Sequence, residues 1–164
     1  MKCKMDLIPL ILLSPILVFV GYFDMRYMRI PNTLSLIALA LFIITAPLLS
    51  WPELAARLTI AGIVFLTGTF AFAMRWLGGG DVKIMSCLML FVPSQSLALF
   101  AFGFSASMLI GVFFILTIRA APWLSTASWA SVQARGKFPM GISIALSGII
   151  HPFLTSAFTI RWIG

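Results

Sequence analysis

Four carboxylates occur in this chain of 164 residues, and their positions suggest two different uses. Asp6 and Glu53 fall in polar joints between apolar segments, where a solvated carboxylate costs little. Both are therefore interpreted as surface charges. Asp24 and Asp81 instead follow the ends of two long apolar segments, which would place them on the same side of a membrane and at similar depth.

An acid at membrane depth is costly, which makes it a candidate functional residue. The apolar segment after Asp81 is short, so this carboxylate is expected to be recessed below the membrane surface. Two carboxylates that meet in a low-dielectric cleft cannot both ionise easily and share one proton. Such a pair supplies a general base for water and a general acid for a leaving amine. Asp24 and Asp81 are thus candidates for peptide-bond hydrolysis, although their spacing alone does not establish that they pair.

The composition indicates that the solvent around these acids is lipid. Hydrophobic residues make up 62% of the chain and charged residues 9%, whereas a soluble domain has about 25% charged residues. The net charge of +7 comes from Lys and Arg scattered at the ends of apolar segments. This scatter argues against nucleic acid as a partner, because binding it needs a clustered basic face. Two cysteines and one histidine, far apart, do not form a four-ligand zinc site, and no cofactor is expected.

The apolar segments predict an all-α fold, a polytopic membrane helix bundle with about six transmembrane helices in a single domain, residues 1–164. The segments cover residues 7–23, 33–50, 58–77, 82–92, 97–118 and 138–160. A crossing takes roughly 20 helical residues, so the fourth segment suits a re-entrant or buried helix as well as a full crossing. Residues 119–137 form the longest joint and are expected to be either a short amphipathic helix at the interface or a mobile loop.

The distribution of Lys and Arg favours an outside N-terminus. This orientation places seven basic residues inside, namely Arg26, Arg29, Arg75, Lys83, Arg119, Arg135 and Lys137. It leaves four outside, namely Lys2, Lys4, Arg57 and Arg161. The same orientation puts Asp24 and Asp81 at the cytosolic edge of the bilayer.

Two motifs surround the acids. Residues 24–32 read DMRYMRIPN, so Asp24 is followed by Ile-Pro-Asn six residues on, and residues 78–83 read GGGDVK. Together they resemble the paired motifs of the prepilin peptidases, which are GxGD-type membrane aspartic proteases. Residues 137–145, KFPMGISIA, are partly similar to the Pro-x-Gly-Pro entry to that family's last helix. Because Ser143 departs from the family pattern there, no catalytic role is transferred to this segment.

The resemblance implies an endopeptidase that removes the leader from type IV prepilins at the cytosolic face of the bacterial inner membrane. Asp24 and Asp81 would be the catalytic pair, with Gly78, Gly80 and Lys83 in the loop that meets the substrate. Longer family members add a zinc-binding domain and methylate the new N-terminus, but no counterpart is found here. The chain is most similar to the short, peptidase-only form associated with tight-adherence (Flp) pili, and methylation is not expected.

Several of these residues also have simpler structural interpretations. The three glycines before Asp81 suit a helix boundary, and their missing side chains would also let a substrate backbone approach the acid. Asn32 suits a helix N-cap, and Lys83 suits a cytosolic anchor. His151 is expected to be a packed or pore-lining core histidine, far from the two acids.

Two other functional classes use similar features. A transporter or proton channel also contains intramembrane acids and glycine-broken helices. An assembly factor without enzymatic activity would keep the scaffold and need neither acid. Both alternatives remain open from the sequence.

Overall fold

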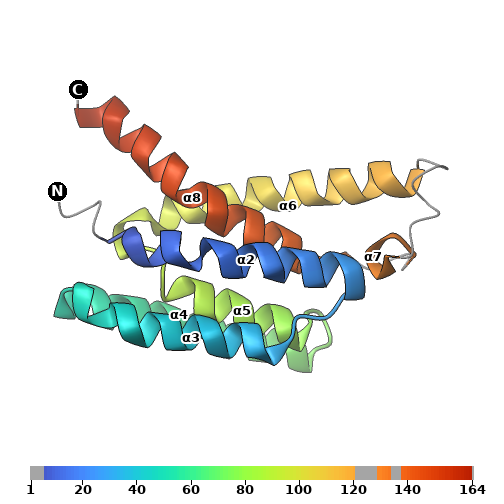
Figure 1. Ribbon diagram of the computed structural model, residues 1–164, viewed down its shortest axis with the longest axis horizontal. Helices are drawn as coiled ribbons and strands as arrows, with labels where there is room; N and C mark the ends of the chain where they lie inside the picture. The colour runs from blue at the N-terminus through green and yellow to red at the C-terminus, as the bar shows by residue number, and fades with distance from the viewer. Residues whose placement is uncertain (1–5, 121–128, 134–137, 164) are drawn as a thin grey trace.

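Helices make up almost all of the computed structural model, which describes residues 6–120, 129–133 and 138–163, and these residues include no strand (Figure 1). The long helices are α2 (Ile8–Tyr27), α3 (Asn32–Thr45), α4 (Trp51–Ala73), α5 (Gly79–Met89), α6 (Leu97–Ala120) and α8 (Met140–Ile163). Shorter pieces are η1 (Ala46–Leu48), η2 (Ser94–Ser96) and α7 (Ala130–Gln133). The predicted all-α class is confirmed, and each of the six expected apolar segments contains a helix.

Four of these helices are long and apolar enough to cross a membrane: Ile8–Tyr27, Trp51–Ala73, Ser94–Ala120 and Met140–Phe158. The segment Asn32–Leu48 is apolar but shorter. Helix α5 has 11 residues and rises only about 16 Å, about half the thickness of a hydrocarbon core. Helix α5 is therefore too short for a full crossing, which favours the buried alternative for the fourth predicted segment, and the predicted polytopic membrane helix bundle fits the four long apolar helices.

Helix α4 begins earlier than the sequence suggested. Residues 51–57 were expected to be a polar joint, but they form the first two turns of the helix. Pro52 occupies the first turn, where the missing N–H costs nothing, and Glu53 follows it at the positive end of the helix dipole. The apparent joint is therefore the start of the helix.

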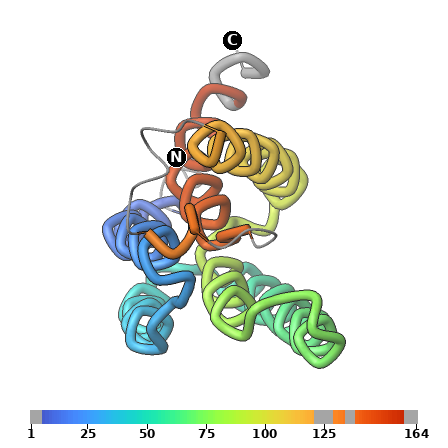
Figure 2. Tube along the Cα trace, turned by 90° about the vertical axis from the view of Figure 1, so that its right-hand side faces the viewer, coloured from blue at the N-terminus to red at the C-terminus, as the bar shows by residue number. Residues whose placement is uncertain are grey.

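The helices form two layers. Helix α8 packs against α2 and α6 in one layer, while α3, α4 and α5 make up the other (Figures 1 and 2). Apolar side chains fill the space between the layers, including Leu13 and Leu17 of α2, Leu88 of α5 and Ile144 of α8. Large apolar residues such as Leu66, Phe102 and Leu109 are exposed on the outer surface, which suits contact with lipid.

Part of the long joint between α6 and α8 is ordered. Helix α7 is a single turn that packs against α2 and α6, and the Ser131 carbonyl accepts bonds from Arg119 Nε and Nη2 at 3.2 and 2.6 Å. The expected helix in this joint is thus present in part. Residues 121–128 and 134–137 lie outside the described chain.

Candidate active site at one end of the helix bundle

The two sequence motifs lie at the same end of the bundle because α2 and α4 run in the same direction (Figure 1). Helix α2 ends at Tyr27. The next residue, Met28, adopts a left-handed conformation with φ 50°, and its N–H bonds to the Asp24 carbonyl at 2.9 Å. The extended Pro31 then starts α3. After α4, Arg75 has φ 61° and Gly78 caps α5. Two tight chain reversals, one after α2 and one after α4, thus bring both motifs to the same end of the bundle.

Asp24 faces the start of α8 and is 5% exposed. Its Oδ2 accepts the backbone N–H of Gly141 at 2.6 Å, and the N–H of Ile142 also contacts this carboxylate. The first N–H groups of a helix have no partner within it and carry a positive partial charge, so they hold an acid well. A Cβ on Gly141 would lie 2.8 to 2.9 Å from three atoms of Asp24. The position therefore requires glycine.

Asp81 lies in the first turn of α5 and is half-buried. Its carboxylate turns back to the backbone N–H of Gly78, the N-cap residue, as the acid of a capping box does. A Cβ on Gly78 would lie 2.6 Å from Asp81 Oδ2. The first glycine of the Gly-x-Gly-Asp motif thus makes room for the acid itself.

Gly80 and Lys83 join the second motif to the first. A Cβ on Gly80 would lie 3.2 Å from Ile30 Cβ, so the missing side chain lets α5 approach the Ile-Pro-Asn segment closely. Lys83 Nζ donates to Asn32 Oδ1 at 3.1 Å. Asn32 is the first residue of α3 and makes no cap bond, because Pro31 occupies the N-cap position. The N-cap interpretation of Asn32 is therefore wrong, and Lys83 holds a protein partner rather than serving only as an anchor.

Asp24 and Asp81 lie at the same end of the bundle, because Asp24 contacts Gly141 at the start of α8 and Asp81 lines a cavity together with Met140, the residue before Gly141. No ion pair links either acid to a Lys, Arg or His among the described residues. Two acids held by backbone N–H groups at helix starts, without a counter-ion, can share a proton and bind a water molecule.

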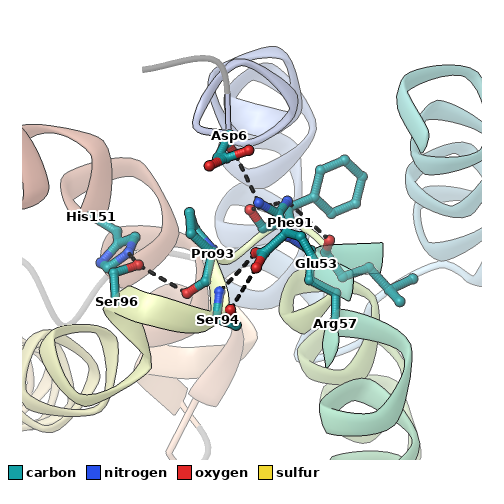
Figure 3. Close-up of polar contacts among 9 residues, drawn as sticks. Asp6, Glu53, Arg57, Phe91, Pro93, Ser94, Ser96 and His151 are labelled. Atoms are coloured by element: carbon teal, nitrogen blue, oxygen red, sulfur yellow. Dashed lines mark hydrogen bonds and ion pairs between the residues drawn. The ribbon is translucent and has the colours of Figure 1, made fainter. Parts of the chain in front are cut away.

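Glu53 was interpreted as a surface charge, and this interpretation is wrong. It lies at the opposite end of the bundle with a side chain only 12% exposed, and it forms a 2.8 Å ion pair with Arg57, which is fully buried (Figure 3). Ser94 donates its N–H and its hydroxyl to the same carboxylate at 2.8 and 2.5 Å. The spacing of Glu53 and Arg57, four positions apart on a helix, was the signal that could have found the pair.

His151 is packed as predicted, with 1% exposure, near the middle of α8. Its Nε2 lies 2.9 Å from Ser96 Oγ (Figure 3). Its ring meets that of Phe100 edge to face. It is about three helical turns past Gly141 and takes no part in the candidate site. Among the described residues no three His, Cys, Asp or Glu side chains gather into a possible metal site.

Comparison with known proteins agrees with this arrangement. A family model described as the type IV leader peptidase family matches residues 11–116, a range that includes both acids and both motifs. No curated protein and no solved structure matches the chain. Because the family model covers well over half of the sequence, the chain belongs to the type IV leader peptidase family.

Proposed function

We propose that this leader peptidase is an aspartic endopeptidase in which Asp24 and Asp81 together activate the water that cleaves a prepilin. Family membership supports a prepilin as the substrate. The observation that carries the catalytic assignment is geometric. Asp24, which is buried, contacts Gly141, and Asp81, which is half-buried, lines a cavity with the preceding residue Met140, and neither acid forms an ion pair with a cation of the described chain. Such an arrangement destabilises a fold, so function is the simplest reason for it.

The proposed reaction needs one proton shared by the pair. The ionised carboxylate removes a proton from water as the oxygen attacks the peptide carbonyl, while the protonated acid donates its proton to the carbonyl oxygen. Collapse of the resulting tetrahedral diol breaks the C–N bond. The acid that gained the water proton donates it to the leaving amine, and the diol returns a proton to its partner.

We further propose that the site faces the cytosol at the inner membrane. The basic residues that flank this end of the bundle are Arg26, Arg29, Arg75, Lys83 and Arg119. Arg57 and Arg161 lie toward the other end, and Arg57 is buried in an ion pair. An excess of Lys and Arg next to membrane spans marks the cytosolic side.

The deciding experiment is processing of a co-expressed Flp-type prepilin by the wild type and by Asp24→Asn and Asp81→Asn, followed by mass spectrometry. The wild type should release a pilin shortened by its leader and carrying an unmethylated N-terminus, and both variants should leave the precursor intact. Full processing by either variant would exclude the two-acid mechanism. Ion flux through the purified protein in liposomes, without any cleavage, would favour a transporter instead.

The shared proton also sets the pH dependence. Activity should fall in acid, where the base becomes protonated, and in alkali, where the pair loses its proton, giving a bell-shaped profile of kcat/KM. The profile is measured with purified enzyme in detergent, with and without a metal chelator. A loss of activity on chelation would contradict the proposed mechanism.

A further inference from the structure

An apolar groove lies on the face of the bundle where α2 and α8 pack together, and neither catalytic candidate lines it. Its volume is about 390 Å³. Gly21 of α2 and Ala145 of α8 form its floor, because the missing side chain lets the helices approach until a Cβ on Gly21 would lie 3.4 Å from that of Ala145. Larger side chains such as Val18 and Leu146 form its walls. Val18 is exposed, so the groove opens toward the lipid.

The groove has the length of one half of a bilayer. It runs along α2 from Met25 to Leu17 and along α8 from Ile142 to Ile149. Eight residues of α-helix rise about 12 Å, close to the roughly 15 Å of hydrocarbon in one leaflet. An apolar cavity of about 150 Å³ holds benzene, so this groove has room for roughly fifteen carbon atoms. One extended acyl chain fits these dimensions, whereas a transmembrane helix would run through both leaflets.

A cationic side chain lies at the end of the groove nearest the active site. Tyr22 lines the groove, and its hydroxyl accepts a hydrogen bond from Arg26 Nη1 at 2.5 Å. The Arg26 guanidinium carbon also lies 5.9 Å from the ring centre of Tyr22 and 5.5 Å from that of Tyr27. Arg26 is exposed, and no carboxylate of the described residues forms an ion pair with it. A guanidinium has five N–H donors, so this one is held at the groove with donors left for an external anion.

Aromatic side chains mark the same end of the groove. Trp129, which also lines the groove, precedes α7, the single turn that packs against the ends of α2 and α6 (Figure 1). Arg119 holds this turn in place through its two bonds to the Ser131 carbonyl. Trp and Tyr rings at a membrane boundary lie at the level of the lipid headgroups. Trp129 and Tyr22 therefore mark the depth at which a lipid headgroup would meet Arg26.

We propose that the groove binds one acyl chain of an anionic phospholipid whose phosphate is bound by Arg26. The planar guanidinium matches the geometry of a phosphate. An anionic headgroup suits the site because the ammonium group of a zwitterionic lipid would bring a second cation beside the guanidinium. The proposal does not depend on the peptidase function, since neither acid takes part in it.

The experiment measures lipid binding by the purified full-length chain in detergent, with native mass spectrometry as the readout. The chain is titrated with phosphatidylglycerol or with phosphatidylcholine that carries the same acyl chains. The wild type should bind one phosphatidylglycerol about fivefold more tightly than phosphatidylcholine, as expected of a single cation near an anionic headgroup. Glycerol phosphate, which has no acyl chains, should not displace the lipid. Displacement would indicate a site for the headgroup alone and would overturn the proposal.

Two variants test the two parts of the site, each with a matched control. Val18→Trp fills the groove and should weaken the binding of both lipids at least about tenfold. Phe19→Trp is its control, because Phe19 is the next residue, is equally exposed and does not line the groove. Arg26→Gln should abolish the preference for phosphatidylglycerol while phosphatidylcholine still binds. Arg75→Gln is the control here, because Arg75 is exposed at the same end of the bundle and does not line the groove.

Three results would overturn the proposal. The first is equal affinity of the wild type for the two lipids, and the second is undiminished lipid binding by Val18→Trp. The third is that Val18→Trp binds lipid normally but no longer binds a synthetic prepilin helix, which would assign the groove to a peptide. If Val18→Trp fails to fold, Arg26→Gln still decides, because an unchanged headgroup preference in that variant contradicts the assigned role of Arg26. Loss of peptidase activity alone would leave all these binding results unaffected.

Discussion

Glu53 at one end of the bundle lies against a cation, whereas Asp24 at the other end lies close to a second acid. Arg57 neutralises Glu53, and its guanidinium also donates to the carbonyls of Asp6 and Phe91 at 3.0 and 3.2 Å (Figure 3). Asp24 and Asp81 are held by backbone N–H groups, and no cation of the described chain pairs with them. At the first end the carboxylate has a partner of opposite charge, whereas at the second end two carboxylates lie near each other.

The difference separates two uses of a buried acid. The paired carboxylate of Glu53 joins α4 to the segments beside it. Removing either partner of the ion pair therefore leaves the other charge buried without a counter-ion. Two neighbouring acids without a cation form no such link, and their mutual repulsion raises the free energy of the folded state. The same residue type is therefore structural at one end and a candidate catalyst at the other.

The largest difference between the two ends is expected when one acid is removed at each end. Asp81→Asn should reduce prepilin processing by about 10²- to 10⁴-fold, the usual contribution of a general acid or base. It should leave stability unchanged or raise it, because the repulsion with Asp24 disappears. Glu53→Gln should instead lower thermal stability and leave processing per folded molecule normal. An equal loss of processing in both variants would remove the distinction.

Arg57→Met tests the structural end alone. Leaving one partner of a buried ion pair without the other costs about 3 to 5 kcal/mol, and the Arg57 side chain is fully buried. Unfolding in detergent should show this loss. Arg26→Met is the control, since Arg26 is exposed and should cost at most about 1 kcal/mol. Comparable stability of the two variants would contradict the structural role of the pair.

Gly141→Ala tests whether the Gly141 backbone positions the Asp24 carboxylate. The new Cβ would meet Asp24 at 2.8 to 2.9 Å and force its carboxylate to move. Displacing a reacting group by about 1 Å can cost on the order of 10²-fold in rate. Gly62→Ala is the matched control, because a Cβ there meets nothing within 4 Å. Processing kinetics should fall for the first variant and stay normal for the second.

The smallest effect concerns the bond between Lys83 and Asn32. Lys83→Met and Asn32→Leu should each lower kcat about fivefold, corresponding to a hydrogen bond worth about 1 kcal/mol. The double variant should fall no further, because both changes remove the same bond. Lys83→Arg should keep most of the activity. Additive losses would show that the two side chains act separately.

Composition and motifs were enough to predict the class of the molecule and to single out the two acids as catalytic candidates. Long apolar runs require helices in lipid, since a helix satisfies its own backbone hydrogen bonds. The motifs around Asp24 and Asp81 lie at span ends, and the scarcity of acids made them conspicuous. These features are local, so spacing and composition were enough to find them.

Which groups meet could be learned from the packing of the helices alone. Nothing near Gly141 in the sequence indicates that its N–H holds Asp24, and the partner of Lys83 lies 51 positions away. Glu53 resembled a surface charge until α4 was found to start at Trp51 and to turn Arg57 into the bundle. The cavity beside Asp81 likewise needs four helices to form. Contacts between distant segments depend on how helices pack, and helical periodicity carries no record of which faces will pack together.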